Sequence, residues 1–256
     1  MPDVLPHQIL SPADGSAAEI VNAGGRSDIV LVCEHASAMI PVSLENLGLN
    51  PADRESHAVW DPGAAALALR LSELLDAPLL LGRISRLVHD CNRPPDRADA
   101  MPARTETIEI PGNRDLTAAE RQARTREVYE PFHASLSAVL DSVSTPPALV
   151  TIHSFSPVWF GKRRETRIGL LHDTDPKMAQ AMLRAAPEGV EVVLNEPYSA
   201  ADGVTHLLKK HGTARGLSSV MIEVRNDLLT TKDAVEKIAA TLHAMILAAM
   251  TELETA

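Results

Sequence analysis

Apolar positions follow two spacings along this chain. Short runs that are almost wholly apolar and rich in β-branched residues, such as IVLVC at 29–33, alternate with longer stretches such as AAALALRLSELLDA at 64–77, where apolar residues recur every three or four positions. The first spacing is typical of strands covered on both faces of a sheet, and the second is typical of amphipathic helices. The expected strands are 29–33, 78–81, 148–152, 167–171, 190–194 and 220–222.

Capping signals mark where two of the helices begin. Asp61 precedes Pro62 and an apolar stretch, which predicts an N-cap with proline at the first helical position. Thr117 is followed three residues later by Glu120, which predicts a capping box. The segment 94–115 is rich in proline and charge, and it predicts a long loop over the surface or over a site. The expected helices are 62–76, 117–144, 176–186 and 232–253.

The alternation of strands and helices predicts a single domain over residues 1–256, because no repeat and no glycine-serine linker interrupts it. We expect a three-layer α/β fold, in which a central mixed, largely parallel sheet carries helices on both faces. Ligands of such folds bind beyond the carboxyl ends of the strands, so a site is expected at that edge of the sheet.

Charge and cysteine content narrow the class of protein. The chain has 24 Lys and Arg against 34 Asp and Glu, a net charge of −10, and no basic tract, which disfavours nucleic acid or an anionic membrane as the main partner. With only Cys33 and Cys91, a disulfide framework is not expected and a reducing compartment fits better. No signal-peptide pattern and no run of about 18 apolar residues occurs. We therefore expect a soluble cytoplasmic protein, monomeric or a small homo-oligomer.

Polar side chains follow or end several of the expected strands. Two histidines, several carboxylates and two arginines would meet where the carboxyl ends of the strands converge. This inventory is typical of a metallohydrolase, because catalytic zinc takes about three histidine or carboxylate ligands and leaves a position open for water. The residues are Glu34, His35, Asp90, Asn92, Arg93, His153, Glu223 and Arg225.

Four segments resemble the N-formylglutamate amidohydrolase family and together span most of the chain. They are CEHASAMIP, WDPGAAALALRLSELLDAPLLLGRISRLVHDCNRP, TIHSF and DGVTHLLKKHGTARGLSSVMIEVRNDL. More distantly, that family is similar to the zinc carboxypeptidases and aspartoacylases. The resemblance implies a zinc-exopeptidase-like fold, a divalent metal with zinc as the expected ion, and a small anionic N-acyl amino acid as substrate. It also implies the reaction, in which N-formyl-L-glutamate becomes formate and L-glutamate, a step of histidine degradation.

The resemblance also implies roles for particular residues. A histidine at a strand end and a later histidine hold the metal in such enzymes, and the matching positions are His35 and His153. An Asp-x-Asn-Arg segment supports the site and matches Asp90-Cys91-Asn92-Arg93. A glutamate near the end of the chain activates water and matches Glu223.

One position departs from the pattern of the distant relatives. They supply an acidic zinc ligand three residues after the first histidine, where this chain has Ala38. The third ligand is then Glu34, Asp61 or another residue, unless the metal site is altered or empty. Neighbouring residues on a strand point to opposite faces, so Glu34 and His35 share a metal only if the strand has already ended. This argument favours Asp61, which also fits a helix cap.

The remaining polar residues have more than one interpretation. Asp90 either balances a nearby arginine or accepts a hydrogen bond that orients His35. Either Arg86 or Arg93 stabilises the oxyanion, with Arg86 the first choice, and the other arginine holds substrate carboxylates together with Asn92. We also expect Arg225 and His211 to contact substrate. His57, His133 and His172 carry little signal, and we expect them on solvated surfaces.

Two other functions fit the same residues. The same machinery could hydrolyse a different N-acyl amino acid or a small peptide, because a pocket discriminates weakly between side chains that differ by a methylene. A metal-less binding protein of the same fold is the non-enzyme alternative, and Ala38 is its best support.

Overall fold

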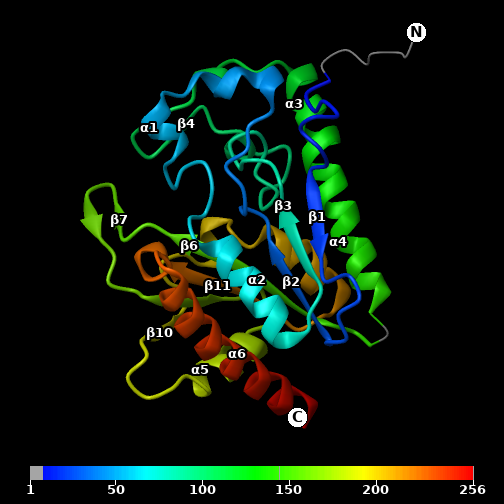
Figure 1. Ribbon diagram of the computed structural model, residues 1–256, viewed down its shortest axis with the longest axis vertical. Helices are drawn as coiled ribbons and strands as arrows, with labels where there is room; N and C mark the ends of the chain where they lie inside the picture. Colours follow the sequence, from blue (N-terminus) through cyan, green and yellow to red (C-terminus); the bar gives the residue numbers. More distant parts are fainter. Residues whose placement is uncertain (1–7, 144, 256) are drawn as a thin grey trace.

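The computed structural model describes residues 8–143 and 145–255. Its main sheet has the strand order β1-β3-β2-β6-β11-β9-β10 (Figure 1). Neighbouring strands are parallel except for the pairs β1 with β3 and β11 with β9. The predicted mixed, largely parallel sheet is thus confirmed. The strands are β1 (Ala18–Val21), β2 (Ile29–Cys33), β3 (Leu79–Gly82), β6 (Ala148–Phe155), β9 (Ile168–Leu171), β10 (Val192–Leu194) and β11 (Ser219–Arg225).

Two strands run further than the sequence predicts. β6 was expected to stop before His153, and β11 before Glu223, because polar residues follow apolar runs at both places. Instead the two strands stay paired in parallel as far as Arg225 opposite Phe155, with Glu223 opposite His153. The polar side chains therefore stand on the sheet itself. The edge strand β1 was not predicted, because only two of its four residues are large and apolar.

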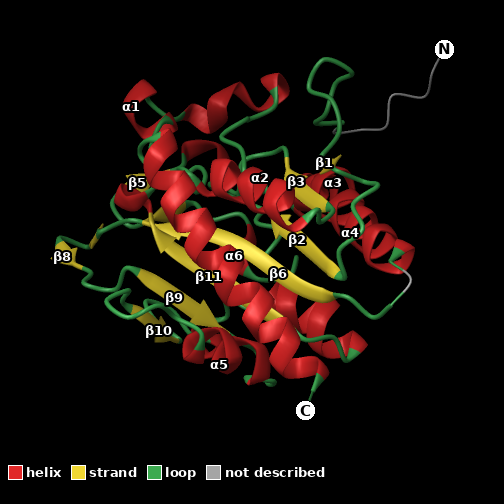
Figure 2. Ribbon diagram, turned by 60° about the horizontal axis from the view of Figure 1, so that its bottom comes forward, coloured by secondary structure: helices red, strands yellow, loops and turns green. Residues whose placement is uncertain are grey.

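Helices cover both faces of the sheet, as Figure 2 shows. Alternate side chains of β2 enter two separate cores. Leu31 belongs to a core that includes residues of α2, α5 and α6, whereas Val32 belongs to a core on the opposite face that includes residues of α4. The three-layer architecture is confirmed. The helices of the first face are α2 (Ala64–Leu75), α5 (Lys177–Arg184) and α6 (Lys232–Glu254), and those of the second are α3 (Ala118–Arg124) and α4 (Glu130–Ser142).

The start of α2 differs from the prediction in a way that matters for the site. The helix begins at Ala64, and its N-cap is Gly63, so Asp61 is not the cap and Pro62 is not the first helical residue. Gly63 has φ +84, and a Cβ there would lie 2.5 Å from Cβ of Leu229. Glycine is therefore needed for this turn. The Asp61 carboxylate is left free for other partners.

The predicted long helix is interrupted. Its capping box at Thr117 and Glu120 is confirmed. A π-helical turn, Thr125–Tyr129, separates α3 from α4 and directly precedes the first turn of α4, which contains Pro131. Proline has no N–H to donate to the carbonyl four residues earlier, so regular α-helical bonding fails there. The predicted end at Ser144 lies outside the described residues.

The segment 94–115 contains short elements rather than a structureless loop. It holds a two-stranded hairpin, β4 (Arg104–Thr105) with β5 (Ile108–Glu109), between two short helical turns. A second hairpin, β7 (Val158–Trp159) with β8 (Lys162–Arg163), projects at the left edge of Figures 1 and 2. The remaining short helices are Val42–Gly48, α1 (Pro51–Arg54), Ala98–Ala100, Pro111–Asn113, Ala200–Asp202, Leu208–Gly212, Thr213–Arg215 and Asn226–Leu228.

Helix α6 is long and apolar enough to cross a membrane when judged by length and composition alone. In the structure it packs along α2 and α5 and buries one side, including Leu242, Met245 and Ile246. Core helices pass the same test, so this property alone does not indicate a membrane span.

Candidate metal centre

His35 lies just beyond the end of β2. The strand ends at Cys33, and Glu34 and His35 form a turn, so strand alternation no longer separates their side chains. Gly82 of β3 passes directly beside this turn, and a Cβ there would lie 2.1 Å from the carbonyl oxygen of Glu34. Both Glu34 and His35 are buried, with 2% of each exposed.

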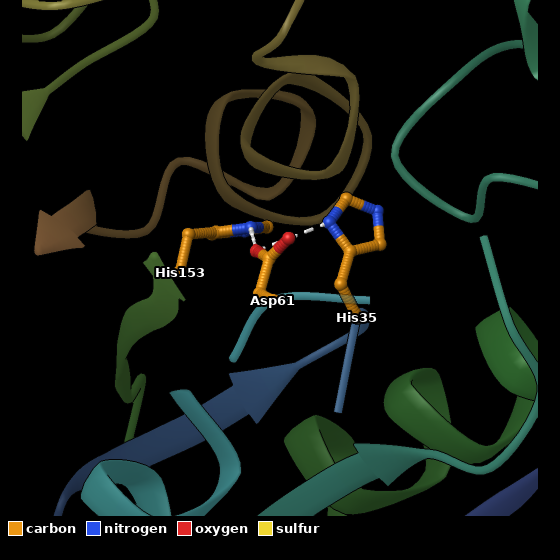
Figure 3. Close-up of side chains that lie close together, drawn as sticks. All are labelled: His35, Asp61 and His153. Carbon is orange, nitrogen blue, oxygen red and sulfur yellow. Dashed lines mark hydrogen bonds and ion pairs between the residues drawn. The ribbon is translucent and has the colours of Figure 1, made fainter. Parts of the chain in front are cut away.

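Asp61 joins the two histidines that the sequence predicts as metal ligands. Its backbone N–H donates to the carbonyl of His35 at 3.0 Å. Its Oδ2 lies 3.3 Å from Nδ1 of His35 and 3.0 Å from Nδ1 of His153, as Figure 3 shows. One ligand atom from each residue lies within 4.8 Å of the other two. Among the described residues, these three form the one set that could hold a metal ion in this way.

A second carboxylate stands behind each of the two histidines. Nε2 of His35 lies 2.8 Å from Oδ1 of Asp90, and Nε2 of His153 lies 3.1 Å from Oε1 of Glu34. The Glu34 contact has the distance of an ion pair without hydrogen-bond angles. A carboxylate on the far nitrogen fixes the tautomer and the orientation of a metal-binding imidazole. Glu34, one of the two named candidates for the third ligand, therefore lies behind His153, and Asp61 is the carboxylate grouped with the two histidines in the candidate site.

The charges around this group fit a divalent cation. Burial opposes protonation of His153, but Glu34 and Asp61 outweigh it and raise the pKa of His153 well above its usual value. The pKa of His35 is also raised, because Asp90 and Asp61 outweigh burial and the charge of Arg86. With both rings doubly protonated, three carboxylates are balanced by two imidazolium ions and one guanidinium. A divalent ion in place of the two Nδ1 protons leaves the same total charge.

Arg86 is committed to this carboxylate network. Its Nη1 lies 3.2 Å from Oδ1 of Asp61, and its Nη2 lies 2.9 Å from Oδ2 of Asp90. The side chain is 27% exposed and lines the cavity described below. Two carboxylates thus already bind the guanidinium that the sequence predicts to stabilise an oxyanion.

Glu223 stands beside His153 because the two residues are partners in neighbouring parallel strands. Its side chain is buried, and its Oε2 has no hydrogen-bond partner among the described residues. Burial raises the pKa of Glu223 to about 7, although the charge of His153 acts against this rise. A carboxyl group in this state both accepts and returns a proton near neutral pH.

The metal centre opens into a cavity of about 260 Å³. His35, Asp61, His153 and Glu223 line it, so the predicted ligands and the predicted base share one space. Further lining comes from residues 57–58 and 86–93, the segment 94–115, the end of β6 with the β7–β8 hairpin that follows it, and Tyr198 with Val204.

The predicted substrate-binding residues divide into two groups. Asn92 and Arg93 line the cavity. The amide of Asn92 bonds the backbone of Val204 and Leu207, at 2.5 and 2.9 Å, so it holds the chain in place. Arg93 donates from Nε to Asp99 and from Nη1 to the carbonyl of Asn92, and its Nη2 has no partner among the described residues.

Arg225 and His211 do not reach the cavity. The guanidinium of Arg225 turns away to Asp227 and to two backbone carbonyls, those of Arg164 and Glu165. His211 is buried, and its Nε2 lies 2.7 Å from Nδ1 of His133. The prediction that Arg225 and His211 contact substrate is therefore not supported, because neither residue lines the cavity and both the Arg225 guanidinium and Nε2 of His211 have other partners.

Several cavity residues were missed by the sequence analysis. His57, which was expected on a solvated surface, lines the cavity and lies 3.2 Å from Glu106 through its Nε2. Trp159 and Tyr198 also line it. The chain has only two tryptophans and two tyrosines. The presence of Trp159 and Tyr198 in turn-rich segments was therefore the one feature of the sequence that could have indicated a role for them at the site.

Comparisons with known proteins agree with the resemblance found in the sequence. A model of the N-formylglutamate amidohydrolase family matches residues 27–230. The crystal structure of a gene product from Agrobacterium tumefaciens is 46% identical, with a TM-score of 0.93 over 96% of this chain and 99% of that one. The structure of an N-formylglutamate amidohydrolase from Ralstonia eutropha has 18% identity and a TM-score of 0.68, over 94% of this chain and 100% of that one, and it shares the fold.

The more distant likeness is weak. A metallo-carboxypeptidase from Burkholderia cenocepacia has a TM-score of 0.39 and 12% identity over 93% of this chain and 65% of that one, which is too slight to bear on the site. The search of curated proteins found no match.

Proposed function

Because the chain belongs to the N-formylglutamate amidohydrolase family, we propose that it hydrolyses the formyl amide of N-formyl-L-glutamate to formate and L-glutamate. His35, Asp61 and His153 would hold a divalent metal, with zinc as the expected ion. The observation that carries this proposal is the triad of ligand atoms within 4.8 Å, with a carboxylate behind each histidine. In this proposal Asp61 would supply the carboxylate ligand that Ala38 cannot, so Ala38 no longer favours the alternative of a metal-less binding protein.

The chain's own residues divide the chemical work. When bound, the ion lowers the pKa of water and polarises the substrate carbonyl. Glu223 accepts a proton from the attacking water while the water oxygen bonds to the formyl carbon. This step gives a tetrahedral oxyanion. Glu223 then delivers that proton to the nitrogen as the C–N bond breaks. The unpartnered Oε2 of Glu223, buried in the cavity beside His153, supports this role.

Arg93 is the residue we assign to a substrate carboxylate. It lines the cavity, keeps its Nη2 without a partner among the described residues, and is fixed by Asp99 and the carbonyl of Asn92. A guanidinium held in this way binds a carboxylate with little further loss of side-chain entropy. We place the reaction in the cytoplasm, as a step of histidine degradation, and the two free cysteines, Cys33 and Cys91, support a reducing compartment.

A related substrate is the second candidate. The cavity wall contains Phe155, Trp159 and Tyr198, which is more aromatic surface than a formyl group and a glutamate side chain require. This lining favours an N-acyl amino acid with a larger apolar part.

The test is formate release from N-formyl-L-glutamate by the wild type and by His153→Ala, with bound metal counted by elemental analysis. We expect near-stoichiometric metal and activity in the wild type and the loss of both in the variant. His243→Ala is the matched control, because His243 lies on α6, away from the cavity. A panel of formyl, acetyl and succinyl amino acids identifies the preferred substrate. Full activity without metal would contradict the proposal.

A further inference from the structure

The hydroxyl of Tyr198 lies at the cavity wall, and its proton has no acceptor among the described residues. Its hydroxyl oxygen accepts a hydrogen bond from Nη1 of Arg164 at 2.9 Å. A guanidinium only donates, so the hydroxyl proton of Tyr198 must go to another acceptor. Within residues 8–143 and 145–255, the hydroxyl has no other hydrogen-bond partner. Tyr198 lines the same cavity as Glu223.

Arg164 is held in place by aromatic rings. Its guanidinium carbon lies 4.7 Å from the ring centroid of Tyr198, 5.0 Å from that of Trp159 and 5.6 Å from that of Phe155. Cation–π contacts of this kind stabilise the guanidinium from several sides. The backbone carbonyl of Arg164 also accepts a hydrogen bond from Nη1 of Arg225 at 3.0 Å, which ties it to the end of β11. Arg164 is thus a fixed donor to Tyr198.

The hydroxyl of Tyr198 keeps its proton at neutral pH. Burial raises the pKa of Tyr198, and the nearby Glu223 carboxylate raises it further, against the charges of Arg164 and Arg86. Arg86 is the other donor expected for an oxyanion, but Asp61 and Asp90 already bind its two terminal nitrogens. Tyr198 is therefore a neutral donor on this wall whose hydroxyl proton is taken by no acceptor among the described residues.

We propose that the Tyr198 hydroxyl donates a hydrogen bond to the oxyanion formed at the substrate carbonyl, and that Arg164 is the positioning residue that directs it there. This inference rests on the amidohydrolase function proposed above. A preorganised donor at the developing charge lowers the barrier of acyl transfer, because it strengthens as the carbonyl becomes an oxyanion.

The first test is Tyr198→Phe, which removes the hydroxyl and keeps the ring against Arg164. We expect kcat on the best N-acyl amino acid to fall by about 100-fold. KM should change by no more than about twofold, because the lost contact forms in the transition state. Metal content and thermal midpoint should match the wild type. A wild-type kcat in this variant would overturn the inference, and so would a raised KM with unchanged kcat.

A double-mutant cycle tests the role of Arg164. We expect Arg164→Met to lower kcat by about tenfold, because Tyr198 loses its restraint. In the Tyr198→Phe background the same change should cost nothing further, since Arg164 acts through the hydroxyl. Arg164→Lys, which keeps the charge over the rings, should lie between the wild type and Arg164→Met.

The matched control for the cycle is Arg163→Met. Arg163 belongs to the same hairpin, but its side chain is 72% exposed, so kcat should not change. Additive losses in the double variant would overturn the positioning role of Arg164. A wild type that hydrolyses none of the N-acyl amino acids would overturn the proposed function and this inference together. An active wild type with an equally active Tyr198→Phe would overturn the inference alone.

Discussion

Among the residues that the structure describes, buried histidines occur in two groups, and the groups differ in what surrounds them. The candidate metal centre contains His35 and His153, which face carboxylates at both ring nitrogens. In the other group, the histidine–tyrosine cluster, Nδ1 of His133 lies 2.7 Å from Nε2 of His211, and Nε2 of His206 lies 2.7 Å from the Tyr129 hydroxyl. The cluster consists of the buried His89, His133, His211 and Tyr129 and the half-buried His206.

These partners shift the pKa values of the two groups in opposite directions. Carboxylates raise the pKa of His35 and His153 in spite of burial. In the cluster, burial lowers the pKa of His133 to about 2, with the charges of His211 and His206 adding to the effect. The pKa values of His89, His206 and His211 fall to about 4, again mainly through burial. Burial of histidines is thus not sufficient for a cation site, whereas carboxylates at both ring nitrogens distinguish the candidate site at His35 and His153.

The largest effect on metal binding and activity should come from changing Asp61, the carboxylate between His35 and His153. Asp61→Asn keeps the size of the side chain and removes the charge shared by the two Nδ1 atoms. We expect bound metal to fall close to zero and formate release to fall by about 10³-fold or more. Elemental analysis and initial rates measure the two effects. Retained metal in this variant would show that Asp61 is not a ligand.

A smaller effect should follow from changing the carboxylate behind one histidine. Asp90→Asn removes the negative charge from the side chain that accepts a hydrogen bond from Nε2 of His35. We expect metal affinity to weaken by about 10- to 100-fold, measured by competition with a chelator. Asp99→Asn is the control for metal affinity, because Asp99 binds Arg93 and Arg97 instead. Equal affinity in Asp90→Asn and the wild type would remove Asp90 from the support of His35.

The smallest effect should come from the histidine–tyrosine cluster, and it should concern stability alone. His133→Leu leaves the carbonyl of Cys91 and the ring of His211 without their partner. We expect the free energy of unfolding to fall by about 1–3 kcal/mol in urea titrations at pH 7. Metal content should stay at the wild-type level.

The pH dependence of that stability provides the control. Unfolded histidine titrates near 6.5, whereas the cluster histidines have lower pKa values in the folded state, so the unfolded chain binds more protons below about pH 6.5. Wild-type stability should therefore fall as the pH drops from about 6.5 toward 4. The fall should be shallower in His133→Leu, which has one such histidine fewer. If the unfolding free energy had the same slope against pH in both proteins, His133 would bind a proton as readily in the folded state as in the unfolded state.

Much of the fold follows from local patterns in the sequence. The apolar run 29–33 and the capping box at Thr117 depend on neighbouring residues only, and both appear as predicted. The ends of β6 and β11 could not be predicted in this way, because His153 and Glu223 stay in the ladder through pairing with each other. Local polarity does not reveal a partner 70 residues away.

The part of the site that the sequence could predict consists of the histidines and the glutamate that follow or end apolar runs. His35, His153 and Glu223 line one cavity, where the sequence analysis expected them to converge, and their roles stay predictions. Glu34 and Asp61 were both acidic candidates, and only the turn after β2 shows which one faces the two Nδ1 atoms.

Arg164 gave no signal in the sequence, and Tyr198 gave none beyond being one of only two tyrosines. Their contact depends on packing between the β7–β8 hairpin and the segment after β10. Contacts of this kind arise from tertiary structure and have no local pattern that could predict them.

Strands β6 and β11 should tolerate no change in length. Their parallel pairing sets Glu223 opposite His153, and side chains alternate between the two faces along each strand. A single residue inserted or deleted upstream in either strand would turn one of these two side chains to the helix-covered far face. An extra residue in the exposed turn at Gly161, which has no atom near its Cβ position, leaves this pairing intact. Homologous chains are therefore expected to vary in length at the hairpins and to keep these two strands free of gaps.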